Sequence, residues 1–316
     1  MTSPALVSLE HPAGARARVL AGFGFNCFDW TIEHASRPVQ VLWQHEDFAS
    51  GQQRPSGSGI PLLFPFPGRI AGGRFSWNGR QYSLPATDGR GNAIHGFVHQ
   101  RPWRVIEQTA TEVTGEFHAG RDAPELLEQW PGDFRMRVRV TLEARSLRLV
   151  VVCDNPGSRP LPCGFGAHPY FRLPLGGDRA ADCQVSLPVR SRWELIDLLP
   201  TGQRLPIDQA ETLQAGRPFS ELTLDDVFTD LVFEEDWTTA QIHDPMSGLQ
   251  LQARYDRSFR ECVVYTPPHR EAICIEPLTC VPGAILLHEQ GIESGLRVLS
   301  PGESFTSRLQ LTVRLH

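Results

Sequence analysis

Glycine and proline recur throughout the chain, and this distribution restricts the possible folds more than any other feature of the sequence. The 316 residues include 28 glycines and 26 prolines. Both residue types interrupt helices, and at short intervals they are typical of turns between strands. The distribution therefore predicts many short strands joined by turns. Only the segment from Asp122 to Trp130 has the pattern of a short helix.

Three segments alternate apolar and polar residues with a period of two. They cover residues 135–142, 147–153 and 308–315, and the turn-forming sequence Asp154-Asn155-Pro156-Gly157 follows the second. Such alternation is typical of antiparallel strands that are buried on one face. The chain has no internal repeat and no low-complexity linker. We therefore expect residues 1–316 to form a single all-β domain, a large antiparallel sandwich.

The composition excludes several functional classes. All 30 residues counted as Lys or Arg are arginines, so no lysine is available for a Schiff base or a phosphate-binding P-loop. The net charge is −6 and no basic block is present, which argues against nucleic-acid binding. No apolar run approaches the roughly 18 residues of a membrane span. The seven cysteines, an odd number without C-x-x-C spacing, and the lack of a signal pattern favour reduced thiols in a cytoplasmic protein.

Three ionisable residues lie in apolar or Gly/Pro-rich stretches, where pKa values are often shifted. They are His95, His168 and Glu276. His95 taken alone is best explained as a buried structural histidine, and for His168 a packing role and a functional role are equally compatible with the sequence. Glu276 is the most informative, because a glutamate on a buried strand is normally either paired or functional. Its alternative role is an ion pair with one of the arginines.

A metal site is not expected. His95 and His99 are four residues apart, as in a zinc-binding helix, but Gly91, Gly96 and Pro102 argue against a helix there. No third ligand has a suggestive spacing.

Taken together, the unusual segments resemble the aldose 1-epimerase (galactose mutarotase) family, over roughly residues 20–315. The most specific match is His168-Pro169-Tyr170-Phe171, which is similar to the H-P-Y-F motif of that family. The other matching segments are Arg69-Ile70 with Gly73 and Phe75, Ile94-His95-Gly96 with Trp103, Leu224 to Phe228, Val264 to Pro267 with Glu276-Pro277, and Ser300 to Glu303.

The resemblance implies a function and a role for each matching residue. Glu276 would be the general base at the anomeric hydroxyl, His168 the general acid at the ring oxygen, and His95 a polarising group. The implied substrate-binding residues are Arg69, Asp225, Tyr170 and Arg172. The implied fold is an antiparallel β-supersandwich without cofactor, a monomer or homodimer acting on a small sugar.

The implied reaction is consistent with elementary acid–base chemistry. Ring opening needs one proton removed and one delivered, and a carboxylate with an imidazole is the minimal pair near neutral pH. His168 must be protonated to act. We therefore expect an anionic neighbour, Glu276 itself, to raise the pKa of His168.

Two departures from the family pattern leave the substrate open. Gly68 replaces the usual Asn before Arg69, and Arg172 replaces the usual Asn after the H-P-Y-F motif. Arg172 either faces an anionic substituent or is a solvated surface residue, and we favour the surface. An anionic substrate would have to be met by arginine, histidine or backbone N–H groups, first of all Arg69, Arg74 and Arg172.

Three alternative functions remain. The first is a hexose-6-phosphate 1-epimerase of the same fold, and the second is a non-catalytic carbohydrate-binding protein. The third is a glycoside hydrolase that uses Asp225 and Glu276 as its carboxylate pair. The two histidines, and the absence of a second glutamate in an equally buried context, argue against the hydrolase.

Overall fold

The structure, a computed structural model, describes residues 5–316 and consists mainly of antiparallel strands. The N-terminal sheet has four strands in the order β1 (Leu6–Glu10), β2 (Arg16–Leu20), β3 (Asn26–His34) and β4 (Arg37–Gln40). A nine-stranded sheet follows the order β10 (Arg104–Gln108), β11 (Glu112–His118), β12 (Arg135–Leu142), β13 (Ser146–Asp154), β27 (Ser304–Leu315), β23 (Leu249–Asp256), β22 (Trp237–Asp244), β17 (Gln184–Ser186) and β20 (Arg217–Pro218).

An eight-stranded sheet contains the strands that carry Asp225, Tyr170 and Glu276. Its order is β19 (Leu199–Pro206), β18 (Ser191–Ile196), β21 (Asp225–Thr229), β24 (Glu261–Tyr265), β25 (Ala272–Leu278), β15 (Gly166–Ala167) and β5 (Leu62–Leu63), and β16 (Tyr170–Arg172) also pairs with β25. Three strand pairs complete the fold: β14 (Leu161–Cys163) with β26 (Arg297–Leu299), β6 (Arg69–Ile70) with β9 (Ala93–Ile94), and β7 (Arg74–Trp77) with β8 (Arg80–Ser83).

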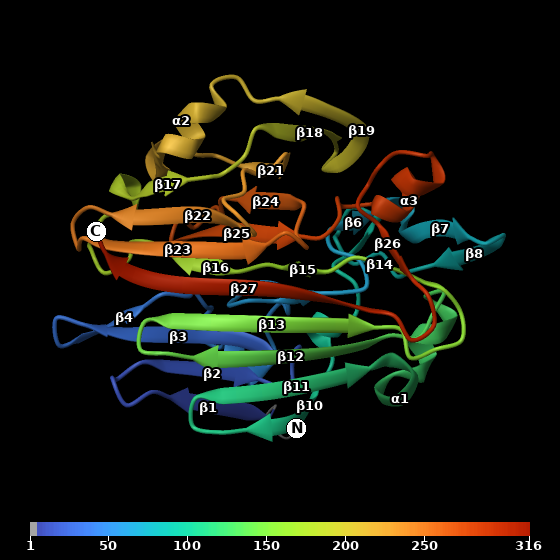
Figure 1. Cartoon of the computed structure of the whole chain (residues 1–316), viewed down its shortest axis with the longest axis horizontal. Coiled ribbons are helices and arrows are strands. Elements are labelled where there is room, and N and C mark those ends of the chain that lie inside the picture. Colours follow the sequence, from blue (N-terminus) through green and yellow to red (C-terminus); the bar gives the residue numbers. More distant parts are fainter. Residues whose placement is uncertain (1–4) are drawn as a thin grey trace.

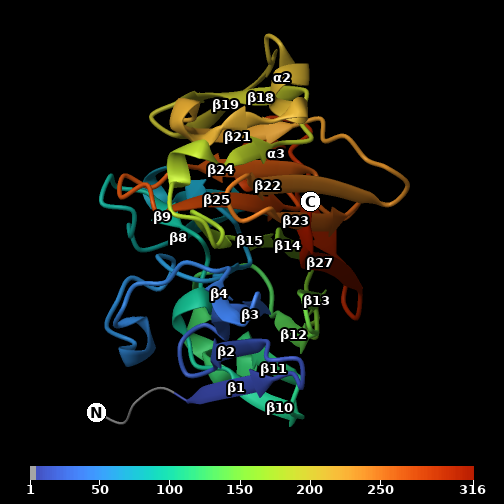
Figure 2. The same cartoon turned by 90° about the vertical axis from the view of Figure 1, so that its left-hand side faces the viewer.

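The nine-stranded sheet forms one layer of the molecule. The other layer contains β1–β4 and the eight-stranded sheet (Figures 1 and 2). One hydrophobic cluster, which runs from Val7 in β1 to Val313 in β27, fills the space between the layers. This arrangement is the expected antiparallel sandwich. The expectation of a single domain over residues 1–316 stays a prediction.

The predicted strands are confirmed. β12 covers residues 135–142, and its buried residues alternate with more exposed ones along the whole strand. β13 contains the second alternating segment, and β27 begins at Ser304, four residues before the third. On the outer face of this sheet, Arg135 and Arg137 form ion pairs with Asp154 and Glu116. The charged side of the alternation therefore faces solvent, as predicted.

The prediction for helices was partly wrong. Residues 122–130 do not form one helix: α1 (Ala119–Asp122) is followed by a 3₁₀ helix, Pro124–Glu128. Ala123 separates the two with a non-helical backbone, and Pro124 has no N–H group to continue the first. Two helices were missed, α2 (Ala210–Ala215) and α3 (Ala284–Glu289). Both have six residues, too few for a clear helical period.

Within residues 5–316, none of the helices has the length and apolar character needed to span a membrane.

Candidate active site

The candidate acid and base are in direct contact. Glu276 lies on β25, and His168 lies between β15 and β16, which both pair with that strand. His168 Nε2 is 3.2 Å from Glu276 Oε1, and both side chains are more than 90% buried. Residues 108 positions apart in the sequence thus form one pair, because neighbouring strands carry them to the same face of the sheet.

Strand register assembles the rest of this face. Opposite residues of antiparallel strands point to the same side of a sheet. Asp225 on β21 lies opposite Tyr265 on β24. Tyr265 also lies opposite Cys274 on β25, on its other side. Cys274 lies opposite Tyr170 on β16. Glu276 is two residues beyond Cys274, on the same side.

A cavity of about 250 Å³ opens over this face. That is slightly below the roughly 300–1,000 Å³ of pockets for drug-sized ligands, and it suits a single sugar ring. The cavity brings together six of the seven predicted site residues. Its lining comprises Arg54, Gly68, Arg69, Arg90, Ile94, His95, His168, Tyr170, Leu195, Leu198, Asp225, Val227, Val263, Tyr265, Glu276, Leu278 and Pro282.

The β6–β9 pair positions Arg69 and His95 at the cavity. Arg69 lies opposite Ile94, and the backbone N–H of His95 donates to the carbonyl oxygen of Gly68. The φ angle of His95 is +69°, an uncommon value for a residue with a side chain. Gly96 also has a positive φ, and a Cβ there would lie 2.1 Å from the carbonyl oxygen of Phe64. The glycine after His95 is therefore required by a close backbone approach.

Gly68 has a local structural cause. Its φ is +69°, and a Cβ at this position would lie 2.5 Å from the Cβ of Pro282. The ring of Pro282 thus occupies the space where the Asn side chain of the family pattern would begin. Both residues line the cavity, so the substitution at 68 and the proline at 282 together shape its wall.

The aromatic and imidazole rings pack in a row beside the acid–base pair. The rings of His168 and Tyr170 stack at 4.8 Å between centroids with an angle of 5°, and the hydroxyl of Tyr170 donates to the carbonyl oxygen of Ser56 at 3.0 Å. The ring of His95 meets that of His168 edge-on at 5.6 Å. Tyr170 therefore fixes the plane of the His168 ring.

Burial favours neutral forms in this pair. It raises the pKa of Glu276 well above its usual value, an effect that Asp225 reinforces and Arg69 opposes. Burial also lowers the pKa of His168, and it lowers that of His95. The expectation that Glu276 raises the pKa of His168 is therefore wrong, because it considered charge and ignored desolvation. Burial thus works against the charged form of each partner, the carboxylate of Glu276 and the imidazolium of His168.

Arg172 lies apart from the other predicted residues. It lines a separate hollow beside Arg37 and Ser247 and does not line the cavity of Glu276. It occupies the last position of β16, beyond Tyr170, with an intermediate exposure. The structure therefore does not bring Arg172 to the candidate site, in line with the surface position favoured above.

Sequence reasoning missed two arginines and a buried glutamate. Arg54 and Arg90 line the cavity from loops that carry no recognisable pattern. Glu261 on β24 is 1% exposed, so the expectation that no second glutamate is equally buried is wrong. Its carboxylate accepts a hydrogen bond from Trp193 Nε1 at 2.9 Å, and Glu261 does not line the cavity.

Three donor groups in the site could hold a metal ion. The ligand atoms of His168, Cys274 and Glu276 all lie within 4.8 Å of one another. Sequence spacing did not reveal this group, because its members come from two distant segments. A metal at this position would occupy the acid–base pair itself.

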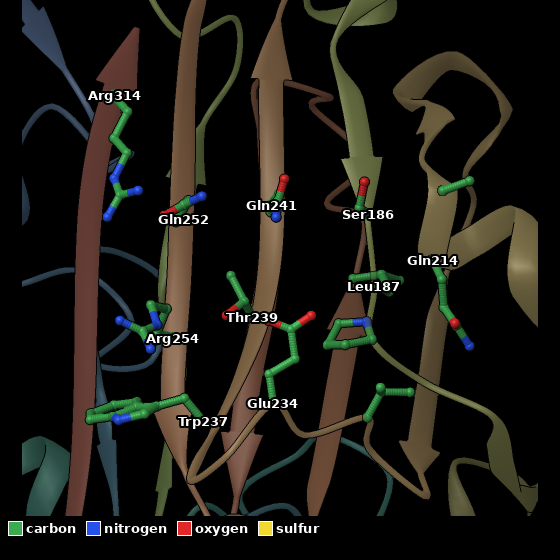
Figure 3. A pocket seen from close by; sticks show the side chains of 13 residues that line it. Ser186, Leu187, Gln214, Glu234, Trp237, Thr239, Gln241, Gln252, Arg254 and Arg314 are labelled. Carbon is green, nitrogen blue, oxygen red and sulfur yellow. The ribbon is translucent and has the colours of Figure 1, made fainter. Parts of the chain in front are cut away.

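A larger hollow of about 490 Å³ lies on the nine-stranded sheet, away from these residues. Figure 3 shows Thr239 and Gln241 of β22 beside Gln252 and Arg254 of β23. The lining of this hollow contains no histidine, and Glu234 is the one carboxylate among its lining residues. It therefore lacks an acid–base pair, and the smaller cavity is the better candidate.

Known proteins are similar to this chain in sequence. A sequence profile described as aldose 1-epimerase matches residues 5–312. The uncharacterized protein YihR of Escherichia coli K12 is 26% identical over 250 residues, 73% of this chain and 74% of that protein. Galactose mutarotase of Sus scrofa is 26% identical over 194 residues, 58% of this chain and 55% of the mutarotase.

Solved structures share the fold along the whole chain. A galactose mutarotase-like protein from Clostridium acetobutylicum has a TM-score of 0.86 at 20% identity and covers 99% of both chains. A GalM/aldose epimerase homologue from C. elegans has a TM-score of 0.81 at 18% identity, again over 99% of both. The predicted galactose mutarotase-like β-sandwich is thus confirmed. With a matching profile over nearly its full length, this chain belongs to the aldose 1-epimerase family.

Proposed function

We propose that the protein is an aldose 1-epimerase that interconverts the α and β anomers of a hexose by acid–base opening of the sugar ring. The observation that carries the proposal is the 3.2 Å contact between His168 Nε2 and Glu276 Oε1 in the wall of a sugar-sized cavity. The anomeric oxygen and the ring oxygen are bonded to the same carbon. A base and an acid that act on them must therefore converge on neighbouring points, as these two groups do.

The proton balance of the reaction suits such a pair. Glu276 as carboxylate takes the proton of the anomeric hydroxyl, the bond from C1 to the ring oxygen breaks, and the ring oxygen takes a proton from His168. A carbonyl group forms at C1, and rotation about the bond next to it presents its opposite face to the hydroxyl group that was the ring oxygen. The two proton transfers then run in reverse and close the ring as the other anomer. After opening, Glu276 holds the proton and His168 is neutral, which is the distribution that burial favours.

The remaining groups would bind the sugar. Arg69 is half-buried and held by Asp88, with Nε 3.2 Å from Oδ2, so its guanidinium is ordered before a ligand arrives. Asp225 is exposed at the rim of the cavity and would accept from hydroxyl groups. His95, kept neutral by burial, would donate or accept one hydrogen bond. None of these roles requires a cofactor.

The pairing of Glu276 argues for epimerisation over glycoside hydrolysis. Its ion-pair partner is an imidazole, whereas hydrolases place two carboxyl groups on either side of a glycosidic bond. Asp225 lies on β21, and β24 separates that strand from β25. The second carboxylate of the cavity is thus two strands away.

The test is the rate of anomer exchange. Freshly dissolved α-anomers of several hexoses and hexose 6-phosphates are followed by polarimetry, or exchange at equilibrium is followed by proton NMR. We expect at least one sugar to be converted well above the buffer rate. No acceleration for any sugar would refute the proposed activity and leave a carbohydrate-binding protein as the alternative.

A further inference from the structure

A buried cysteine lies next to the acid–base pair, and the proposed reaction gives it no role. Cys274 precedes Glu276 by two positions on β25, so both side chains point to the same side of the sheet. It is fully buried and packs with Tyr170. The ligand atoms of His168, Cys274 and Glu276 lie within 4.8 Å of one another, and within residues 5–316 this is the only such group of three.

The three donors are of the types that bind zinc. Thiolate sulfur, imidazole nitrogen and carboxylate oxygen are the usual ligands of Zn²⁺, whereas Mg²⁺ and Ca²⁺ take sites built from oxygen. Bonds of about 2.0–2.1 Å place the nitrogen and oxygen ligands of a tetrahedral zinc ion about 3.3 Å apart. The distance of 3.2 Å between His168 Nε2 and Glu276 Oε1 is close to this value. The pair therefore already has the spacing of two zinc ligands.

Access and charge also suit a single divalent ion. His168 and Glu276 line the cavity and Cys274 does not, so an ion would enter from the cavity and meet the sulfur last. All three side chains are buried, and burial opposes a net charge on any one of them. Zn²⁺ with one thiolate, one carboxylate and one neutral imidazole forms a complex without net charge. Three protein ligands leave a fourth position for water.

We propose that His168, Cys274 and Glu276 form a Zn²⁺ site, and that zinc bound there inhibits the enzyme. Binding releases to solvent the proton of the thiol, and that of the carboxyl group where it is protonated. A metal ion held by Nε2 and Oε1 leaves neither atom able to transfer a proton. Zinc binding is independent of the proposed function, whereas the inhibition rests on it. The spacing of His95 and His99 played no part, since neither belongs to this group.

The first experiment measures zinc binding without reference to activity. The protein is freed of metal with a chelator and dialysed, and Zn²⁺ is then titrated in competition with a chromophoric chelator. We expect Cys274→Ser to weaken the binding of one zinc ion by at least about tenfold, because even residues that only support a metal ligand typically contribute 10- to 100-fold. With Co²⁺ as the probe, a thiolate-to-cobalt charge-transfer band should appear in the wild type and be absent from Cys274→Ser.

The matched control is a second buried thiol on the neighbouring strand. Val263 of β24 lines the cavity, so Cys262 points to the opposite side of the sheet, where it belongs to the main core. Cys262→Ser should keep the zinc affinity within about threefold. Equal losses in both serine variants, or no loss in Cys274→Ser, would overturn the assignment. The second result would place zinc elsewhere, for instance on the stacked rings of His243 and His316. Thermal unfolding without zinc checks that both variants are folded.

The second experiment follows anomer exchange while zinc is added, with a sugar that the protein converts. Each protein is compared with its own rate in the absence of zinc. We expect saturating Zn²⁺ to abolish turnover of the wild type, Mg²⁺ at the same concentration to leave it unchanged, and Cys274→Ser to need at least about tenfold more zinc for half inhibition. Turnover that persists in the zinc-saturated wild type would overturn the inhibition. If no sugar is converted at all, the proposed function fails, and the binding experiment still decides whether the zinc site exists.

Discussion

Two buried glutamates on adjacent strands of the eight-stranded sheet differ in what surrounds them. Glu261 on β24 is enclosed: Trp193 donates to its carboxylate, and the residue does not line the cavity. Glu276 on β25 lines the cavity and has the imidazole of His168 as its ion-pair partner. Burial raises the pKa of both, that of Glu261 to about 7. A raised pKa alone therefore does not identify a catalytic group; contact with an imidazole and a place in the cavity wall distinguish Glu276.

The largest expected effect tests this difference directly. Glu276→Gln keeps the size of the side chain but removes the base, and we expect kcat for anomer exchange to fall by roughly 10²- to 10⁴-fold. The matched control is Glu261→Gln, which we expect to retain kcat within about threefold. Polarimetry measures both. If Glu261→Gln loses as much activity as Glu276→Gln, Glu276 has no catalytic role that Glu261 lacks.

The next test asks whether His168 and Glu276 work as one unit. His168→Asn should also lower kcat by roughly 10²- to 10⁴-fold. Groups that act together are not additive, so the double variant with Glu276→Gln should be no more than about tenfold slower than the slower single variant. Losses that multiply in full would indicate that the two residues act independently.

The pH dependence of stability tests Glu261. Its pKa is about 7 in the folded protein, above its ordinary value of 4.5. The folded state therefore holds more protons than the unfolded state between these values, and the free energy of unfolding falls as pH rises from about 4.5 to 7. Glu261→Gln removes this contribution. We expect the variant to gain about 3 kcal/mol on the wild type between pH 4.5 and pH 8.

Denaturant unfolding at a series of pH values measures the gain. The difference between the two proteins cancels the contributions of other groups, including His99, whose lowered pKa of about 4 acts in the opposite direction. A difference that does not change with pH would show that the pKa of Glu261 is the same in the folded and the unfolded protein, which would contradict the raised pKa.

The smallest effect concerns the donor to Glu261. Trp193→Phe removes the Nε1–H group and leaves the carboxylate without this partner. We expect a loss of about 1–3 kcal/mol in the free energy of unfolding, with kcat retained within about threefold. Chemical denaturation and polarimetry provide the two readouts. A large loss of turnover in a folded variant would mean that the Glu261 region takes part in the reaction.

Local pattern predicted much of the fold, because the features of a half-buried strand are local. The alternation over residues 135–142 depends only on the two faces of β12, and the strand appears with those bounds. The helices were less predictable, since α2 and α3 have six residues each. Their packing against the sheets, which the sequence does not display, decides where they form.

For the site, the sequence predicted residue types better than their environment. The H-P-Y-F motif and the buried segment that contains Glu276 led to His168 and Glu276, and six of the seven predicted residues line one cavity. The direction of the His168 pKa was wrong, because desolvation depends on the whole fold. Arg54 was missed for the same reason: its loop has no motif, and only the fold brings it beside Tyr170.

The contact between Gly68 and Pro282 has a consequence for the substitutions that the chain tolerates. A side chain at 68 would meet the ring of Pro282 on a backbone with positive φ, so position 68 cannot gain a side chain freely while Pro282 is kept. Gly68→Asn should be tolerated only when Pro282→Ala is made as well, which thermal unfolding of the single and double variants can test. The residue that one loop can carry at position 68 thus depends on a residue more than 200 positions away in the sequence.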